Sequence, residues 1–479
     1  MQRSWRSTKM KLYSETGDFK LYQGSMLEML GVIAPNSIDA VVTDPPYELG
    51  FMGKGWDNSG IAFQPDTWRK CYAVLKSGGY LLAFGGTRTF HRIACAIEDA
   101  GFEIRDTIMW LYGSGFPKSM NIGLAIDKKN GVESPVVGVG KSGAPDTHTK
   151  TLHSVSEITG TGWFGGEYEI RQAQNKWSGW GTALKPAYEP VIVARKPCEG
   201  SCLDNVIQYG VGGININACR IPTDEKLSIS TSTTEKYGRN AFYSSKTMNN
   251  PERTQDPNGR YPSNVILTYD DTDFQEVCGG MPTGGANGTV SKAYDYKADV
   301  FGDYKKKEPF DSYGDSGSAA RYYYCAKASK RDRDEGLEAF ETKQCTGGGG
   351  GIGDYLSDVN SCSGKYGSEK APHKNTHPTV KPTDLMQYLI RLVTPPSGTV
   401  LDPFNGSGST GKAVMYENRD RNASYKYIGI ELTAEYLPIA DARIRYAAGD
   451  HSPVTPAEQP LTGQITFFDL LGGENDLPV

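Results

Sequence analysis

The chain has no long apolar run and little net charge, and both absences limit what it can do. No stretch of about 18 apolar residues occurs among its 479 residues, so we expect no helix that crosses a membrane. The basic N-terminus, Met1 to Lys11, has no apolar stretch behind it and does not predict a secretory signal. A formal net charge of −5 gives no overall nucleic-acid signature, so contacts with a polyanion must come from local basic clusters.

Cysteines are few for this length and follow no regular spacing. Their number, nine, is odd, which favours reduced thiols and a cytoplasmic location over a disulfide framework. Cys198, Cys202 and Cys219 are the best candidates for a zinc site, but no further close pair or spaced histidine completes a tetrahedron. We therefore predict no metal centre.

The N-terminal part of the chain alternates between strand and helix patterns. The stretches 38–43, 80–84 and 102–111 are expected to form strands, the first of them buried, and helical spacing of apolar residues occurs at 65–76 and 87–100. Strands that alternate with helices at this spacing predict a mostly parallel sheet.

The same alternation returns near the C-terminus. Helical spacing occurs at 383–393, 408–418 and 433–446, and short apolar strands are expected at 400–401 and 427–430. The two ends together predict an α/β fold with a doubly wound, mostly parallel, Rossmann-like sheet.

A glycine-rich turn lies in the C-terminal block. The sequence DPFNGSGSTG begins at Asp402 and contains Gly406-x-Gly408-x-x-Gly411, a spacing that lets the backbone approach a nucleotide ligand. Glu431 lies 20 residues beyond Gly411, at the end of the next strand, where a carboxylate can accept both hydroxyl protons of a ribose. The pattern fits NAD, another nucleotide or S-adenosylmethionine, and it also fits a glycine turn without a ligand.

The position of this turn separates the candidate ligands. Only 68 residues follow Gly411, which is enough for two strand–helix units but not for a complete nucleotide-binding sheet. Strands from the N-terminal third must complete the sheet, which ordinary dehydrogenases do not require. Asp402 also suits a donor with an ammonium group better than a pyrophosphate, so we predict S-adenosylmethionine as cofactor. The expected cofactor-binding residues are Asp402, Pro403, Phe404, Gly406, Ser407, Gly408, Thr410 and Glu431.

The second motif, Asp44-Pro45-Pro46-Tyr47, follows the strand at 38–43, at a strand end where ligands gather in open α/β sheets. Taken alone it also fits a turn in which proline stops a strand. The Asp44 carboxylate and the Pro45 carbonyl can accept the two protons of an exocyclic base amine and free its lone pair. Tyr47 offers an aromatic face to a flipped-out base. These four residues form the predicted catalytic loop.

The two motifs, in this order, resemble the β class of DNA amino-methyltransferases, with members in phages, prophages and restriction–modification systems. The resemblance covers residues 12–112, 179–197 and 321–446. It implies a permuted sheet, frequent homodimers, and site-specific transfer of a methyl group to a flipped-out base in double-stranded DNA. It favours adenine N6, because cytosine-N4 relatives more often have serine at the position of Asp44.

The stretch HPTVKP, from His377 to Pro382, resembles the motif that precedes the cofactor loop in this family. The resemblance implies that Thr379 and Lys381 bind the carboxylate of the methyl donor. The same stretch also fits the start of a helix capped by Thr383.

Basic residues near tyrosines supply the predicted contacts with DNA phosphates. The stretch RYYYCAKASKRDR at 321–333 is strongly basic, although the same cluster also fits a solvated charged face. A second loop, Phe51 to Asp57, resembles a loop of phage members that we expect to close over the flipped base. The predicted DNA contacts are Lys54, Lys327, Lys330, Arg331 and Arg333.

These assignments divide the chain into six parts. They are 1–112, the catalytic half of the sheet; 113–178, an insertion; 179–197, the last, antiparallel strand of the sheet; 198–320, a loop-rich target-recognition region; 321–446, the cofactor-binding half; and 447–479, a flexible tail. Within the tail, Gln464 to Leu470 (QITFFDL) resembles peptides that dock on bacterial sliding clamps, which makes such a clamp a candidate partner.

Three rival functions stay open at this point. The first is cytosine-N4 methylation on the same scaffold. The second is methylation of RNA or of a protein amide, although glutamine methyltransferases place the glycine loop before an Asn-Pro-Pro-Tyr loop. The third is a DNA-binding protein without catalysis, against which the intact Asp44, Tyr47, Asp402 and Glu431 argue.

Overall fold

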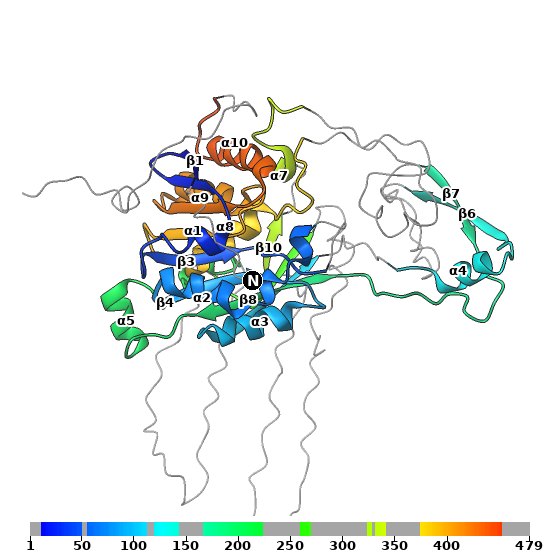
Figure 1. The fold of residues 1–479 in the computed structure, drawn as a ribbon, viewed down its shortest axis with the longest axis horizontal. Coiled ribbons are helices and arrows are strands. Elements are labelled where there is room, and N and C mark those ends of the chain that lie inside the picture. Colours follow the sequence, from blue (N-terminus) through cyan, green and yellow to red (C-terminus); the bar gives the residue numbers. More distant parts are fainter. Residues whose placement is uncertain are drawn as a thin grey trace, which may run out of the picture.

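The computed structural model describes residues 11–49, 55–112, 119–142, 166–223, 259–269, 323–327, 331–341 and 374–452. Within these residues the centre of the fold is one ten-stranded sheet (Figure 1). In the order in which they lie side by side, its strands are β1 (Lys11–Glu15), β2 (Phe19–Gln23), β12 (Lys426–Glu431), β11 (Thr399–Asp402), β3 (Ile38–Thr43), β4 (Leu75–Phe84), β8 (Tyr188–Arg195), β5 (Glu103–Tyr112), β9 (Val265–Tyr269) and β10 (Tyr324–Lys327).

Most neighbouring strands are parallel, which confirms the predicted doubly wound α/β sheet. The exceptions are β1, which is antiparallel to β2, and β8, which is antiparallel to both β4 and β5. The antiparallel strand predicted within 179–197 is β8, but it lies between β4 and β5 rather than last in the sheet. Because it runs against its neighbours, β8 begins at the edge where β3, β4 and β11 end.

Helices cover both faces of the sheet. On one face lie α1 (Met26–Met29), α2 (Pro65–Val74) and α3 (Phe90–Asp99), and on the other lie α8 (Thr383–Val393), α9 (Ser409–Arg421) and α10 (Leu437–Ala447). Alternate residues of the central strands serve the two layers: Val42 packs with the second set of helices, whereas Val41 packs with the first. All six residues of β3 are buried, as expected for a strand covered on both faces.

The two ends of the chain join at the centre of the sheet. Strand β11 pairs in parallel with β3, with Val400 opposite Ala40 and Leu401 opposite Val41. The hydroxyl of Thr43, the last residue of β3, donates to Asp402 Oδ1 at 2.6 Å. The sheet is thus completed by strands from the N-terminal third, and the catalytic and glycine loops leave it from adjacent strands.

Several boundaries differ from the predicted ones. The helix expected at 65–76 ends at Val74, because β4 already begins at Leu75. The helix expected at 433–446 consists of a 3-10 turn, η7 (Ala434–Tyr436), followed by α10. Thr383 begins α8 but makes no capping hydrogen bond, so its predicted role as cap is wrong; its hydroxyl donates instead to Asp332.

Further elements lie in the connections, where periodicity gave no signal. They are η2 (Gly55–Asn58), η3 (Ile61–Phe63), α4 (Ile122–Lys129), β6 (Val136–Ser142), β7 (Gly166–Arg171), α5 (Cys202–Tyr209), η4 (Asn217–Cys219) and α7 (Arg331–Asp334). The β6–β7 hairpin and α4 form an arm that stands away from the sheet (Figure 1).

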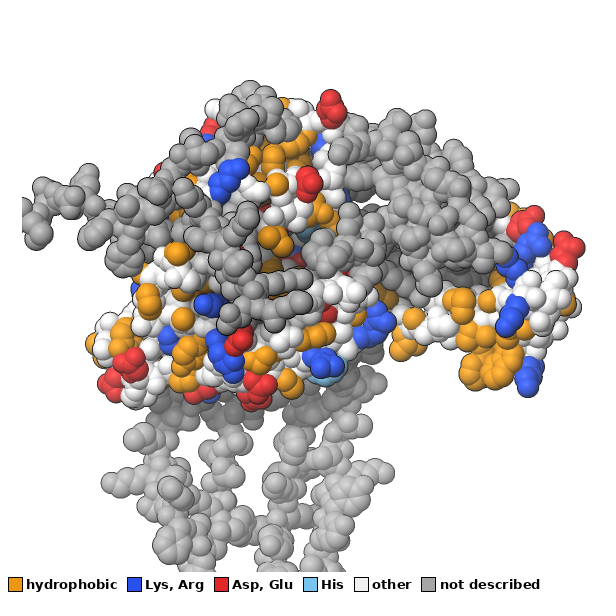
Figure 2. All heavy atoms as spheres, viewed as in Figure 1, with side chains coloured by type: hydrophobic (Ala, Val, Ile, Leu, Met, Phe, Trp, Pro, Cys, Tyr) orange, Lys and Arg blue, Asp and Glu red, His pale blue; other side chains and the backbone are white. Residues whose placement is uncertain are grey.

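The described surface carries charges of both signs. On the face drawn in Figure 2, Lys and Arg side chains alternate with Asp and Glu and form no broad basic area among the described residues. The arm has exposed apolar side chains, among them Val137 and Val139, and Figure 2 shows a hydrophobic area on it. In the described part of the chain, no helix is both long and apolar enough to span a bilayer.

Candidate active site

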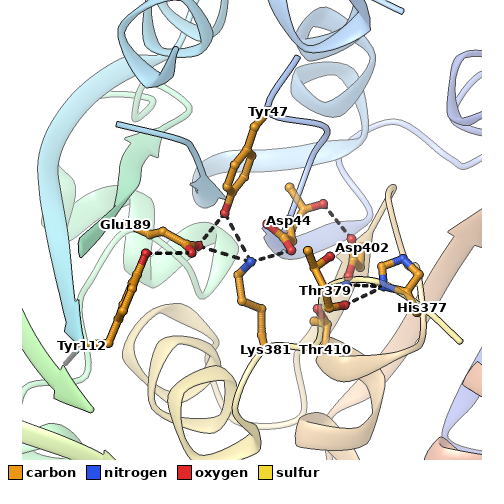
Figure 3. Close-up of polar contacts among 10 residues, drawn as sticks. Asp44, Tyr47, Tyr112, Glu189, His377, Thr379, Lys381, Asp402 and Thr410 are labelled. Atoms are coloured by element: carbon orange, nitrogen blue, oxygen red, sulfur yellow. Dashed lines mark hydrogen bonds and ion pairs between the residues drawn. The ribbon is translucent and has the colours of Figure 1, made fainter. Parts of the chain in front are cut away.

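One cavity of about 1030 Å³ lies at the edge where β3, β11 and β12 end and β8 begins. It contains both motifs: Asp44 to Tyr47 on one side, and the glycine loop with Glu431 on the other. Thr379 and Lys381 of the HPTVKP stretch line the same space. The structure therefore brings together the predicted catalytic and cofactor residues, which are separated by more than 300 positions in the sequence (Figure 3).

Asp44 has one paired and one unpaired carboxylate oxygen. Lys381 Nζ donates to Asp44 Oδ2 at 2.7 Å. Among the described residues, the buried Asp44 Oδ1 has no hydrogen-bond partner. A buried acceptor without a partner is costly, and such atoms are uncommon in folded proteins. Asp44 lines the cavity, and its Oδ1 keeps hydrogen-bonding capacity that no described residue uses.

Lys381 is almost fully buried, and its ammonium lies on the side of the cavity that contains Asp44. Besides Asp44, its ammonium contacts the Tyr47 hydroxyl at 3.2 Å and Glu189 Oε2 at 3.3 Å. Burial by itself lowers the pKa of Lys381, but Asp44 and Glu189 raise it above its ordinary value. These contacts place the Lys381 ammonium beside Asp44, and its predicted contact with the carboxylate of the methyl donor stays a prediction.

Tyr47 is held by its hydroxyl. It donates to Glu189 Oε2 at 2.7 Å, and Tyr112 donates to the other oxygen of Glu189 at 3.4 Å (Figure 3). Burial, Asp44 and Glu189 raise the pKa of Tyr47 well above its ordinary value, so the hydroxyl stays neutral and can donate. The ring orientation is therefore fixed from the end that a stacked base would not touch.

Asp402 lies beneath the glycine loop. Its Oδ1 accepts from Thr43 and from the Phe404 backbone N–H, and its Oδ2 accepts from the Thr410 hydroxyl at 2.6 Å. Burial raises the pKa of Asp402 to about 6 despite these hydrogen bonds. A cation bound nearby would favour the ionised carboxylate.

The glycine loop depends on the absence of side chains. Gly406 and Gly408 have positive φ values of 51° and 78°. A Cβ on Gly406 would lie 2.9 Å from His377 Nε2, and a Cβ on Gly411 would lie 2.5 Å from Ile444 Cδ1. The glycines thus serve a tight turn and close packing of α9, as the fingerprint requires.

Glu431 supports this turn from the end of β12. Its Oε2 accepts the Gly406 N–H and its Oε1 accepts the Thr433 N–H, each at 2.7 Å. Burial raises the pKa of Glu431 to about 7. Each carboxylate oxygen has a further lone pair, so Glu431 can still accept hydroxyl protons from a ligand.

Some residues of the site were not predicted. Glu189 is the second residue of β8, and Arg443 of α10 is fully buried and donates to the Ser407 carbonyl and hydroxyl. His377 packs against the ring of Tyr436, with 4.5 Å between ring centroids, and burial lowers its pKa to about 4. A charged residue beside proline at the start of an apolar strand was the available signal for Glu189.

The predicted DNA contacts are only partly described. Lys54 and Lys330 lie outside the described residues, as do the side chains of Lys327 and Arg331. Arg333 is partly buried and donates to the carbonyls of Asn375 and His377 at 3.4 and 3.2 Å. Arg333 thus supports the HPTVKP stretch, and its predicted contact with a DNA phosphate stays a prediction. The segment Gln464 to Leu470 also lies outside the described residues.

Comparison with known proteins gives matches along most of the chain. Residues 38–442 match the protein family N6_N4_Mtase, described as DNA methylase. The type II methyltransferase M.HindIII of Haemophilus influenzae is 26% identical over 157 residues, which cover 32% of this chain and 38% of that protein. The DNA adenine methyltransferase YhdJ of Escherichia coli is 38% identical over 72 residues, which cover 15% of this chain and 22% of that protein.

Among solved structures, the M1.HpyAVI complex with S-adenosylmethionine aligns with a TM-score of 0.33 and 14% identity, over 89% of this chain and 99% of that chain. The chain spans less than two fifths of the length of the first curated relatives that it matches.

Proposed function

The chain belongs to the DNA methylase family, and from this premise we propose that it transfers a methyl group from S-adenosylmethionine to the N6 amine of an adenine flipped out of double-stranded DNA. The observation that carries the proposal is the state of Asp44. One of its oxygens is held by Lys381, and the other is buried without a partner among the described residues, in the cavity that also contains the glycine loop.

This arrangement suits the chemistry of an exocyclic amine. Such an amine is a poor nucleophile, because its lone pair is delocalised into the ring. Asp44 Oδ1 accepts one amine proton, and the Pro45 carbonyl accepts the other. The nitrogen then becomes more tetrahedral, and its lone pair turns toward the methyl group. As the N–C bond forms, the C–S bond of the sulfonium would break, which leaves a neutral thioether, and the methylated nitrogen would release one proton. Positioning of the two reactants contributes much of the rate.

The opposite side of the cavity fits the methyl donor. S-adenosylmethionine supplies an electrophilic methyl group on a sulfonium. Glu431 accepts hydroxyl protons of the ribose, and Gly406, which lines the cavity, lets the backbone approach the ligand. Asp402, with its pKa raised by burial, favours a cationic group, and the exposed Thr379 is available to the donor carboxylate.

Adenine is the preferred base in this proposal. The loop reads Asp-Pro-Pro-Tyr rather than beginning with serine, and the relative YhdJ is named as an adenine methyltransferase. The remaining parts of the proposal are site recognition by 113–178 and 198–320, and action on DNA in the cytoplasm.

The test incubates the purified chain with double-stranded DNA and isotope-labelled S-adenosylmethionine, followed by nucleoside digestion and mass spectrometry. We expect labelled N6-methyladenine. Labelled N4-methylcytosine would assign the rival base, and an absence of label in DNA would refute the proposal.

A matched pair of variants tests the role of Asp44. Asp44→Asn keeps the shape of the side chain and is expected to lower kcat by about 10²–10³-fold, the range for loss of one group that stabilises the transition state. Its affinity for the donor should be unchanged. Asp66→Asn removes an exposed carboxylate of α2 and serves as control. Equal activity of Asp44→Asn and wild type would refute the assignment.

A further inference from the structure

Glu189 lies in the cavity, but the proposed reaction does not use it directly. It is the second residue of β8, opposite Trp110 of β5. Because β8 is antiparallel, its first residues reach the edge at which β3 ends and the catalytic loop begins. The Gly85 N–H, just after β4, donates to the Pro190 carbonyl at 2.9 Å and fixes this start of the strand.

Glu189 and Asp44 share one ammonium group. Lys381 Nζ lies 2.7 Å from Asp44 Oδ2 and 3.3 Å from Glu189 Oε2. Its third contact is the Tyr47 hydroxyl, which in turn donates to Glu189. The three donors of Lys381 are thereby directed to three separate acceptors, and none points to Asp44 Oδ1.

The charges explain why this arrangement is stable. Lys381 is 7% exposed, and its two carboxylate partners are 23% and 22% exposed, so the three groups meet largely away from water. A buried ammonium gains most when each of its donors has an acceptor. Glu189 supplies one of these acceptors and also orients a second, the Tyr47 hydroxyl.

We propose that Glu189 is a positioning residue for methyl transfer: it draws Lys381 and the Tyr47 hydroxyl away from Asp44 Oδ1, so that this oxygen stays available to the amine of the target base. The inference rests on the proposed function. Without the Glu189 carboxylate, the nearest anion for the freed donor of Lys381 is Asp44. The ammonium would then contact both Asp44 oxygens, and the base amine would compete with it.

The experiment compares wild type, Glu189→Gln and Glu103→Gln in steady-state methylation of double-stranded DNA. Glu103 is the matched control, because it pairs with Arg195 at the other end of β8 and lies outside the cavity. We expect Glu189→Gln to lower kcat by about 10- to 100-fold, the size of a lost hydrogen bond to a charged group. KM for the donor should be unchanged, because Glu189 has no part in the proposed donor site.

A double-mutant cycle separates this role from a structural one. If Glu189 acts through Lys381, adding Glu189→Gln to a Lys381→Met protein should cost less than about threefold in kcat, far below its effect alone. Thermal melting of each variant is measured in parallel. Glu189→Gln is expected to lower the melting temperature somewhat, because it removes a charge partner of the buried Lys381, so the unchanged KM for the donor and the double-mutant cycle separate the two roles.

Three results would overturn the inference. They are a kcat of Glu189→Gln equal to that of wild type, an undiminished further loss in the Lys381→Met protein, and a loss of kcat matched by weaker donor binding. A wild-type protein that methylates no DNA would refute the proposed function itself. An active wild type with an unaffected Glu189→Gln variant would refute only the role of Glu189.

Discussion

Binding of the methyl donor should depend steeply on pH, because two buried carboxylates lie beside its proposed site. Burial raises the pKa of Glu431 from 4.5 to about 7 and that of Asp402 from 3.8 to about 6. Both groups are therefore partly protonated near neutral pH in the free protein. The proposed site requires the ionised forms, since Glu431 accepts ribose hydroxyls and Asp402 faces a cation.

The expected magnitude follows from these values. Between pH 8 and pH 6 the ionised fraction of a group with a pKa of about 7 falls roughly tenfold, so the affinity for the donor falls by about the same factor. Between pH 6 and pH 5 protonation of Asp402 adds to the loss. Linkage fixes the direction in which the affinity changes with pH. The donor binds the ionised carboxylates better, so its binding releases protons, and the affinity rises as the pH rises.

Calorimetric titration with S-adenosylmethionine at pH 8, 7 and 6, in buffers of different ionisation enthalpy, measures both the affinity and the protons released. Glu431→Gln removes the titrating group, and its affinity should change little between pH 8 and 7. The exposed Glu98 of α3 supplies the control variant Glu98→Gln, which should behave as wild type. An affinity of wild type that is the same at pH 8 and 6, or an undiminished pH dependence in Glu431→Gln, would refute this reasoning.

Two further predictions concern packing and base stacking. Gly411→Ala places a Cβ 2.5 Å from both Ile444 Cδ1 and Tyr427 Cε1, so it should lower the free energy of unfolding, measured with denaturant, by about 1–3 kcal/mol. The control Gly213→Ala has open space around the new Cβ and should leave the stability unchanged. Equal stabilities of the two variants would contradict the packing argument. Tyr47→Ala should weaken binding of DNA that has 2-aminopurine at the target position by about 1–3 kcal/mol. Tyr47→Phe keeps the ring face and should keep most of that binding. An equal loss of binding in both variants would argue against stacking.

Much of the sheet follows directly from local patterns. The stretch at 38–43, with its apolar centre, became β3, and the periodic segment at 383–393 became α8 with the same bounds. Such elements are predictable because burial on both faces of a strand, or on one face of a helix, dictates residue type at each position. The short elements α1, α4 and α5 are held by tertiary contacts and caps, and their periodicity is too brief to detect.

The candidate site was predictable to the extent that its residues lie in motifs. Asp44, Tyr47, the glycine loop and Glu431 all line the cavity, as expected from their positions at strand ends. The contacts of Arg333 were not predictable, because a basic residue looks alike in sequence whether it faces DNA or carbonyls of its own chain. Its two carbonyl contacts become visible only when the HPTVKP stretch is placed beside α7.

The sequence by itself determined the chemistry and the order of the two loops. The Asp-Pro-Pro-Tyr motif at 44–47 precedes the glycine loop at 402–411 in the chain, which is the order of the β class. What only the tertiary structure decided is which charges meet. Lys381 reaches Asp44 across 337 positions, and Glu189 joins them because an antiparallel strand begins where the parallel strands end. Contacts of this kind depend on strand order and direction, which no local pattern of residues encodes.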